Sequence, residues 1–238
     1  MQLTSTSIVI PTYNEAKNLP ILLEKISDIS AHFQSLEVII IDDQSKDETS
    51  LVLNEFARKF PWLRYEIRTQ LPCDLSQSVL LGFKMAQKEN IVVMDADLSH
   101  PPLDVIRLIQ ALETNPAANL VLGSRFTAGG STDASWPWLR KWNAYIAKFI
   151  VKELTSVKDP LSGFFAFRRS LLSQSKNLNP IGYKIGLELI VKTSAKHIIE
   201  MPIYFAERSK GNSKLNFKQR WNFLKHLYRL YRYKMSKP

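Results

Sequence analysis

The sequence predicts an α/β fold in which a mostly parallel sheet carries helices on both faces. Two observations lead to this prediction. Short apolar, β-branched runs recur along the first half of the chain, and such runs are typical of strands buried on both faces. Amphipathic stretches long enough for crossover helices lie between these runs. This alternation favours a doubly wound sheet.

The first half supplies the regular alternation, and its expected strands and helices are assigned from the apolar pattern. The expected strands are 7–11, 36–42, 63–67, 90–95 and 119–124, and the expected helices are 16–29, 47–60, 76–88 and 102–114.

The second half has a different pattern. Residues 126–154 contain a Gly-Gly loop followed by an aromatic and basic helix. The apolar run "SGFFAFRRS" at 162–170 predicts a strand, and "YKIGLELIVKTSAKH" at 183–197 predicts a helix. Glu188 in that helix is expected either to reach a ligand or to pair with a nearby cation.

Composition and charge narrow the class of protein. The chain has 238 residues, of which 45% are hydrophobic, so we expect one sizeable core. The single cysteine, Cys73, gives no reason to expect an oxidising compartment, and no apolar run approaches the ~20 residues of a membrane span. We therefore expect a cytoplasmic protein. Its formal net charge of +10 favours an anionic partner.

Carboxylates follow the second expected strand. Ligands of doubly wound sheets bind beyond the carboxyl ends of the strands, so residues at these positions are candidates for ligand binding. Asp47 and Glu48 are typical of a helix N-terminus. Asp42 and Asp43 end an apolar strand, where two adjacent carboxylates require donors or cations to meet them. The hydroxyl and N–H groups of a nucleoside would meet this need.

The fourth expected strand leads into "DADLSHPP". In an extended chain side chains i and i+2 share a face, so Asp95 and Asp97 can point together into the crevice while Ala96 turns away. We expect these carboxylates to bind Mg²⁺ or Mn²⁺, since Mg²⁺ is commonly held by one or two carboxylates plus the phosphates of a substrate. Such an ion would neutralise charge on a departing diphosphate.

Six segments together carry a resemblance to a known family. They are "IVIPTYNEAKNLP", "VIIIDDQSKDET", "IVVMDADLSHPP", "VLGSRFTAGG", "DPLSGFFAFRR" and "ERSKGNSKL". In this order the chain resembles the polyprenol (dolichol) phosphate mannosyltransferases within glycosyltransferase family 2, over roughly residues 5–216.

The resemblance implies an inverting, metal-dependent sugar transfer on a GT-A type, Rossmann-like fold. It implies a domain at 1–216, divided into a nucleotide-sugar half at 1–126 and an acceptor half at 127–216, followed by a helical extension at 217–238. The donor would be a nucleotide sugar, GDP-mannose foremost with UDP-glucose as the alternative. The acceptor would be a polyprenyl monophosphate.

The resemblance also implies a set of site residues. The expected metal ligands are Asp97 and Asp95. The expected nucleotide-sugar contacts are Pro11, Tyr13, Glu15, Asp42, Asp95, Asp97, Arg208 and Lys214. The expected acceptor contacts are Arg125, Arg140, Ser162, Gly163 and Phe164. The expected catalytic groups are Asp97, Arg125, Arg140, Arg208 and Lys214.

The chemistry of the acceptor agrees with the cations in this set. A phosphate monoester has a second pKa near ~6, so it is largely dianionic and nucleophilic at neutral pH without a strong general base. Because both substrates are anionic, cations must orient them and offset their repulsion. Arginine offers a planar fork that suits phosphate oxygens.

The C-terminal segment 217–238 is basic and aromatic. Apolar residues recur in it at helical spacing, namely Trp221, Leu224, Leu227, Tyr228 and Tyr231. Such a helix can pack on its own domain or lie in an anionic lipid interface, and the lipid acceptor favours the second alternative. We therefore expect peripheral association with the cytoplasmic face of a membrane.

Two departures from the family pattern keep other functions open. "LPCDLSQ" stands where relatives have a Gly-rich turn, and Ser99 stands where some relatives have a glutamine near the metal. A catalytically silent protein that binds nucleotide sugars or membranes is the rival from another class. Nucleic-acid binding is disfavoured, because none of its standard motifs is present and the strand-end carboxylates have no role in it. The oligomeric state is not predicted.

Overall fold

The fold is taken from a computed structural model of the chain. It describes residues 2–134, 148–175, 178–182, 184–193, 197–206 and 217–236.

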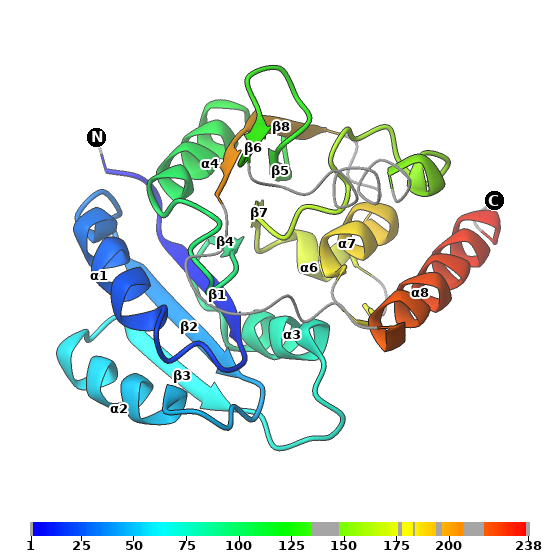
Figure 1. The fold of residues 1–238 in the computed structure, drawn as a ribbon. Coiled ribbons are helices and arrows are strands. Elements are labelled where there is room, and N and C mark those ends of the chain that lie inside the picture. Colours follow the sequence, from blue (N-terminus) through cyan, green and yellow to red (C-terminus); the bar gives the residue numbers. More distant parts are fainter. Residues whose placement is uncertain are drawn as a thin grey trace.

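Strands and helices alternate through the first half of the chain, as expected (Figure 1). The strands are β1 Thr6–Thr12, β2 Leu36–Asp42, β3 Leu63–Ile67, β4 Asn90–Val93, β5 Leu120–Ser124, β6 Ser131–Thr132, β7 Phe165–Arg168, β8 Ile198–Pro202 and β9 Tyr204–Phe205. The helices are α1 Leu19–Ser30, α2 Thr49–Lys59, α3 Leu75–Met85, α4 Leu103–Thr114, α6 Leu171–Gln174, α7 Ile185–Thr193 and α8 Phe217–Met235.

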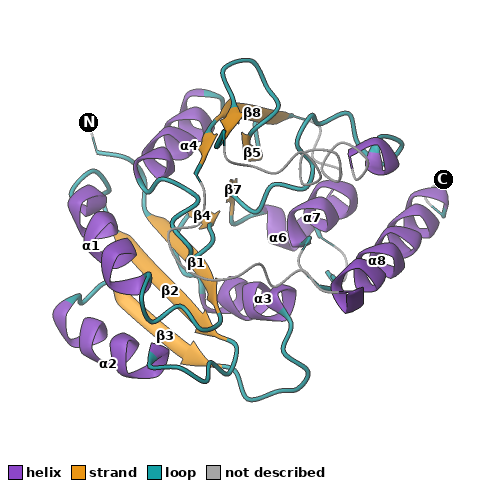
Figure 2. Ribbon diagram, in the orientation of Figure 1, coloured by secondary structure: helices purple, strands orange, loops and turns teal. Residues whose placement is uncertain are grey.

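Seven strands form the central sheet in the order β3-β2-β1-β4-β7-β5-β8 (Figure 2). The pairs β1–β2, β2–β3, β1–β4 and β5–β8 are parallel. β7 runs antiparallel to both of its neighbours, β4 and β5. The prediction of a mostly parallel, doubly wound α/β sheet is therefore confirmed.

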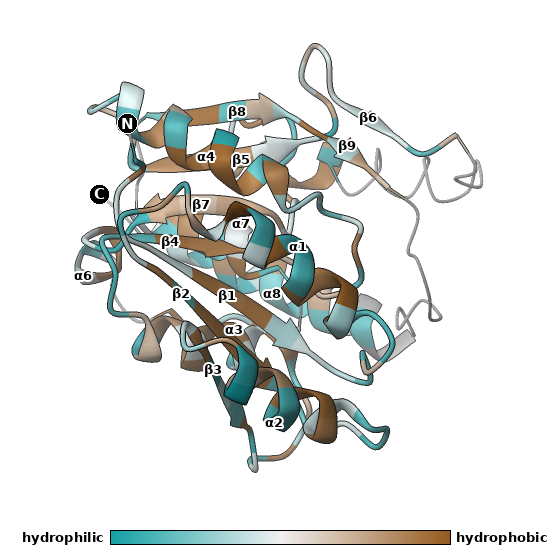
Figure 3. Ribbon diagram, turned by 90° about the vertical axis from the view of Figure 1, so that its left-hand side faces the viewer, coloured by the Kyte–Doolittle hydropathy of each residue, from teal (hydrophilic) through white to brown (hydrophobic). Residues whose placement is uncertain are grey.

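Both faces of the sheet are buried, which explains the continuous apolar runs. In β1, Ile8 and Ile10 pack into the cluster that contains α1, α2 and α4, whereas Val9 packs into the cluster that contains α3 and α7. Figure 3 shows the apolar strands enclosed between helices that carry polar outer surfaces. α3 approaches β1 so closely that a Cβ on Gly82 would lie 2.3 Å from a methyl carbon of Val9.

β4 is shorter than the expected strand 90–95, since it ends at Val93. Met94 still donates its backbone N–H to Val9. The next N–H, that of Asp95, donates instead to the imidazole Nδ1 of His100 at 3.1 Å. The chain therefore leaves the sheet at Asp95, just before the second carboxylate.

α8 packs against α7 with only part of its apolar stripe. Leu227 and Leu230 are buried in a small cluster with Val151, Leu154 and Leu187. A separate set of apolar side chains stays exposed, namely Trp221 at 52%, Leu224 at 50% and Tyr228 at 64%. One side of α8 thus packs on the protein, whereas the other side leaves apolar side chains exposed for contact with a lipid interface. No helix in the described part of the chain has the length and apolar character to cross a bilayer.

Candidate active site

The crevice predicted by doubly wound topology lies beyond the carboxyl ends of β1 and β4. From β1 the chain proceeds outward through β2 and β3 on one side, while β4 lies on the other. Such a reversal of strand order opens a crevice at the strand ends. Polar residues follow both strands. Three other segments also reach this edge of the sheet, namely the segments after β2, after β5 and before β7.

Asp95 lies beside Gly163 at this edge. A Cβ built on Gly163 would lie 3.4 Å from Oδ2 of Asp95. The carboxylate of Asp95 is 33% exposed, so one side of it faces solvent. The absence of a side chain at Gly163 leaves room for a ligand group next to this carboxylate.

Asp97 is oriented by the residue two positions later. Its Oδ1 accepts hydrogen bonds from the hydroxyl of Ser99 at 2.5 Å and from the backbone N–H of Ser99 at 3.1 Å. Asp97 is only 6% exposed. Ser99 therefore contacts the carboxylate of Asp97 directly.

The residues present fit a hard divalent cation that is shared with a substrate. The candidate ligands are the carboxylates of Asp95 and Asp97, and oxygen donors are what Mg²⁺ and Mn²⁺ prefer. Within the described residues, no three carboxylate, imidazole or thiol groups converge as a complete metal cage. Substrate phosphates and water would have to complete the coordination sphere.

His100 is a site residue that the sequence analysis did not identify. Its ring stacks on Phe164 with centroids 4.8 Å apart and meets Phe205 edge-on at 5.2 Å. Burial lowers the pKa of His100, although the carboxylates of Asp95 and Asp97 oppose the shift. Since Nδ1 accepts from the N–H of Asp95, the neutral ring carries its hydrogen on Nε2. His100 thus holds the backbone at the start of the Asp95–Asp97 segment.

The protein itself already supplies a cation and hydrogen-bond donors to the carboxylates at the end of β2. Asp43 forms a buried ion pair with Arg68, with Oδ1 and Nε 2.8 Å apart. Asp42 accepts from the backbone N–H of Ser45 at 3.1 Å and from its hydroxyl. The sequence analysis missed Arg68, because its position directly after β3 gave no sign that its side chain reaches the end of β2.

Arg68 also organises the segment that replaces the relatives' Gly-rich turn. Its Nη2 donates to the carbonyl of Pro72 at 2.7 Å. Asp74 then caps α3 by accepting from the N–H of Gln77, and its second oxygen accepts from the N–H of Gly182 at 3.0 Å. Burial raises the pKa of Asp74, against the effect of these hydrogen bonds. Side-chain contacts thus hold the turn before α3.

The remaining residues expected at the nucleotide lie in β1 and the loop that follows it. Pro11 is a buried β1 residue paired with Ile41 of β2. Tyr13 and Glu15 are partly exposed in the loop, and Glu15 accepts a hydrogen bond from Asn18 at 2.7 Å. Pro11 and Asp42 thus lie at the ends of adjacent strands.

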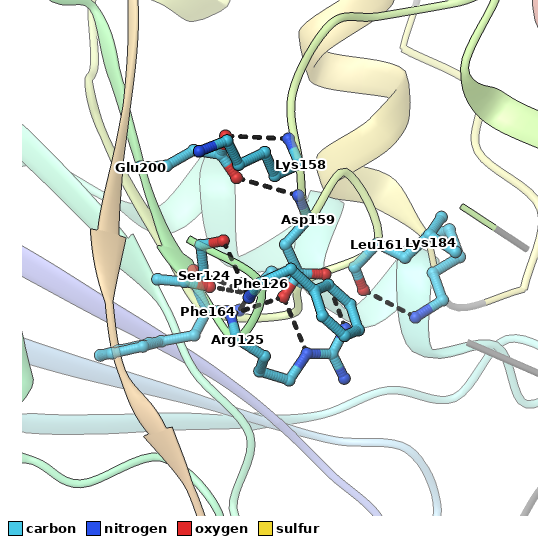
Figure 4. A network of polar contacts seen from close by, with 11 residues as sticks. Ser124, Arg125, Phe126, Lys158, Asp159, Leu161, Phe164, Lys184 and Glu200 are labelled. Atoms are coloured by element: carbon cyan, nitrogen blue, oxygen red, sulfur yellow. Dashed lines mark hydrogen bonds and ion pairs between the residues drawn. The ribbon is translucent and has the colours of Figure 1, made fainter. Parts of the chain in front are cut away.

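Arg125 follows β5 and forms a two-point ion pair with Asp159 (Figure 4). Nε donates to Oδ2 at 2.8 Å, and Nη2 donates to Oδ1 at 2.7 Å. Glu200 of β8 holds the same loop, because its carboxylate accepts from the backbone N–H groups of Lys158 and Asp159. The guanidinium also lies over the rings of Phe126 and Phe205.

Ser162 and Phe164 support the site from within the protein. The hydroxyl of Ser162 donates to the carbonyl of Gly123 at 2.7 Å, which links the loop before β7 to β5. The ring of Phe164 is fully buried against His100. The side chain of Phe164 therefore packs in the core and does not face the crevice.

Lys184 is a third site residue that the sequence analysis missed. Its ammonium donates to the carbonyl of Leu161 at 2.8 Å, on the same loop as Asp159 (Figure 4). Burial and the nearby Arg125 lower the pKa of Lys184 to about 8, although Asp159 and Asp95 oppose the shift. A lysine placed before an apolar helix is indistinguishable, in sequence, from a surface cation.

Several expected residues fall elsewhere. Glu188 pairs with Lys192 and His226, so the expectation of a cation partner is confirmed. Three expected anion-binding residues lie outside the described residues, namely Arg140, Arg208 and Lys214.

Comparison with known proteins identifies relatives along nearly the whole chain. The profile of the family described as Glycosyl transferase family 2 matches residues 7–175. A dolichol-phosphate mannosyltransferase of Pyrococcus furiosus is 37% identical over 94% of the chain, and the chain spans 63% of that protein. A dolichol-phosphate mannosyltransferase of Mycosarcoma maydis is 34% identical over 98% of the chain and 81% of its own length.

A solved structure has the same architecture. Glucosyl-3-phosphoglycerate synthase of Mycobacterium tuberculosis, crystallised with Mn²⁺, uridine diphosphate and glucosyl-3-phosphoglycerate, superposes with a TM-score of 0.70. The two proteins are 18% identical, and the match covers 98% of this chain and 81% of the other. At this identity the likeness shows the fold alone.

Proposed function

The chain belongs to glycosyltransferase family 2, and we propose that it transfers a hexose, mannose foremost, from a nucleotide sugar to a polyprenyl monophosphate. GDP-mannose is the proposed donor, with UDP-glucose as the alternative. The product would be a polyprenyl phosphate sugar with inverted configuration at the anomeric carbon.

One observation carries this proposal. Relatives that share 34–37% of their residues with the chain, over 94% or more of its length, are named dolichol-phosphate mannosyltransferases. The crevice agrees with such a reaction. Two carboxylates follow a central strand, a glycine leaves space beside one of them, and the chain as a whole has a formal net charge of +10.

Asp97 and Asp95 are the proposed ligands of Mg²⁺ or Mn²⁺. When bound, the ion would neutralise the diphosphate that leaves the sugar. Ser99 keeps Oδ1 of Asp97 in a fixed direction, and His100 keeps the backbone of Asp95 in place. The protein thereby prepares the carboxylates before substrate arrives, so little rearrangement is needed on binding.

Cations on the acceptor side have a positioning role in this proposal. The proposed set is Arg125, Arg140, Arg208 and Lys214, with Ser162 and Gly163 beside the sugar. They would hold the acceptor phosphate in line with the anomeric carbon and offset its repulsion from the donor. The dianionic phosphate is itself the nucleophile, so no side chain need remove a proton.

The lipid acceptor requires contact with a membrane, and α8 is the proposed point of contact. Trp221, Leu224 and Tyr228 are exposed on it. Aromatic side chains settle at headgroup depth, and each nearby Lys or Arg adds ~1 kcal/mol at an anionic surface. We propose peripheral attachment on the cytoplasmic face.

The test is a panel of nucleotide sugars incubated with a short polyprenyl phosphate and Mg²⁺ or Mn²⁺. A glycolipid formed from GDP-mannose supports the full proposal, and one formed only from UDP-glucose replaces the donor. Metal-dependent nucleotide binding without any glycolipid would contradict the proposal and identify a binding protein instead.

A further inference from the structure

A pocket of about 550 Å³ lies between α7 and α8. Figure 1 shows α7 and α8 side by side at the C-terminal end of the molecule. Four cationic side chains line the pocket, namely Lys192 of α7 and Lys225, Arg229 and Arg232 of α8. Glu188 is the one carboxylate among its described lining residues. The lining therefore has a clear excess of positive charge.

The charge of Glu188 is already balanced within the protein. Its Oε1 lies 2.6 Å from Nζ of Lys192, and its Oε2 lies 2.8 Å from Nε2 of His226. Burial raises the pKa of Glu188, but hydrogen bonds from His226, Lys192 and the backbone of Asn179 outweigh it and lower the pKa. Glu188 thus stays ionised and offsets Lys192, which leaves the cations of α8 uncompensated in the pocket.

Two of the three cations of α8 lie over aromatic rings. Lys225 lies over the ring of Trp221 at 5.7 Å, and Arg232 lies over the ring of Tyr228 at 5.9 Å. Within the described part of the chain, neither they nor Arg229 form an ion pair. Their positive charge is therefore available to a ligand that enters the pocket.

One residue that lines the pocket has a buried polar atom without a partner among the described residues. His226 is 1% exposed and lines the pocket. Its Nε2 faces the ionised Glu188, which only accepts hydrogen bonds, so Nε2 carries a hydrogen. Nδ1 has no partner among the described residues. A buried polar atom without a partner costs free energy, which a ligand can recover.

We propose that this pocket binds a phosphate group. Phosphate oxygens accept from the two guanidinium forks and from the ammonium of Lys225, and Arg is well matched to phosphate geometry. The site is built on α7 and α8 and is separate from the crevice at β1 and β4.

The same phosphate chemistry has two sources, a phospholipid headgroup and a free phosphorylated compound. Trp221, Leu224 and Tyr228 are exposed on α8, and their contact with a bilayer would bring the pocket close to lipid headgroups. Inorganic phosphate is the probe common to both sources, and vesicles that contain phosphatidic acid distinguish them.

The decisive variant is Arg229→Gln/Arg232→Gln, because both residues are exposed on one turn of α8 and neither is buried in the core. The matched control is Lys25→Gln/Arg58→Gln, which removes the same charge from exposed positions of α1 and α2. Binding is followed by the imidazole NMR signal of His226, assigned from a His226→Gln sample. This local signal separates the pocket from phosphate bound at the catalytic crevice.

Inorganic phosphate should shift the His226 signal saturably in the parent and in the control. The double variant should bind phosphate at least ~10-fold more weakly, since two charge-assisted hydrogen bonds are lost. No saturable shift in the parent, or equal affinity in the double variant, would overturn the proposal.

Two further measurements complete the design. Displacement of phosphate by phosphatidic acid vesicles, but not by phosphatidylcholine vesicles, identifies a headgroup as the occupant, whereas no displacement identifies a free phosphate compound. Both results support a phosphate site. Sugar transfer to a short soluble acceptor should be unchanged in the double variant, so the catalytic proposal is tested separately.

Discussion

Arg125 and Asp159 join the end of β5 to the loop before β7 through three hydrogen bonds. Two come from the guanidinium at 2.7 and 2.8 Å, and the third comes from the backbone N–H of Arg125 at 2.9 Å. Asp159 is 1% exposed. The orientation of Arg125 is therefore set by the protein before any anion arrives.

Replacing Arg125 by alanine should destabilise the protein by ~3 kcal/mol, because a buried carboxylate is left without its partner. Urea denaturation at pH 7 measures this loss. Lys158→Ala, an exposed neighbour, is the control and should change little. Arg125→Met/Asp159→Leu should recover part of the loss, since it leaves no unpaired charge. An Arg125→Ala variant as stable as the parent would show that the pair contributes nothing to folding.

Asp97→Ala should fold normally and lose sugar transfer by at least ~100-fold, since it removes a proposed ligand of the metal. Ser99→Ala is the matched variant, because it removes only the hydroxyl that orients the same oxygen. It should lose activity less and should recover part of it at higher Mn²⁺. Full activity in Asp97→Ala would remove the metal assignment. EDTA should abolish transfer in the parent, and Mg²⁺ or Mn²⁺ should restore it.

Lys184→Met should change how stability depends on pH. In the folded protein the pKa of Lys184 is about 8, below its ordinary value of 10.5. At pH values between these two pKa values, Lys184 is protonated in the unfolded chain and neutral in the folded protein. The free energy of unfolding therefore increases as the pH rises. The parent should therefore gain roughly 2 kcal/mol over the variant between pH 7 and pH 10. Parallel stability curves for the two proteins would contradict the shifted pKa.

Trp221→Ser/Leu224→Ser should weaken binding to anionic liposomes while the fold stays intact, because both side chains are half exposed. Ile21→Ser/Leu51→Ser is the matched control, since it removes exposed apolar groups from α1 and α2. Sedimentation with liposomes measures binding, and transfer to a long-chain acceptor should fall in parallel. Transfer to a short soluble acceptor should be preserved. Unchanged liposome binding would exclude this face of α8 as the contact.

Local patterns predicted the first five strands and the helices between them. Apolar runs and amphipathic stretches are properties of neighbouring residues, so they are legible in sequence. The position of β7 is not, since "FAFR" predicts a strand but nothing local indicates insertion between β4 and β5 in the antiparallel sense. Which apolar residues of α8 are buried and which are exposed likewise depends on packing against α7, a separate element of the chain.

For the site, sequence identified the carboxylates but not the groups that hold them. Asp95 and Asp97 follow a buried strand and share a recognisable spacing. Arg68, His100 and Lys184 act through contacts with other elements, and charged or aromatic residues of this kind occur on any surface. Their roles become visible only once the sheet brings the strand ends together.

The strand order of the sheet also determines when each strand can pair during synthesis on the ribosome. Both strand neighbours of β5 come later in the chain, because β7 begins at Phe165 and β8 at Ile198. β1 to β4 can assemble as soon as they emerge, whereas β5 must wait for at least forty further residues, the distance from Ser124 to Phe165. During that interval translation leaves an apolar strand without a partner, at the stage when nascent chains are open to aggregation and chaperone capture.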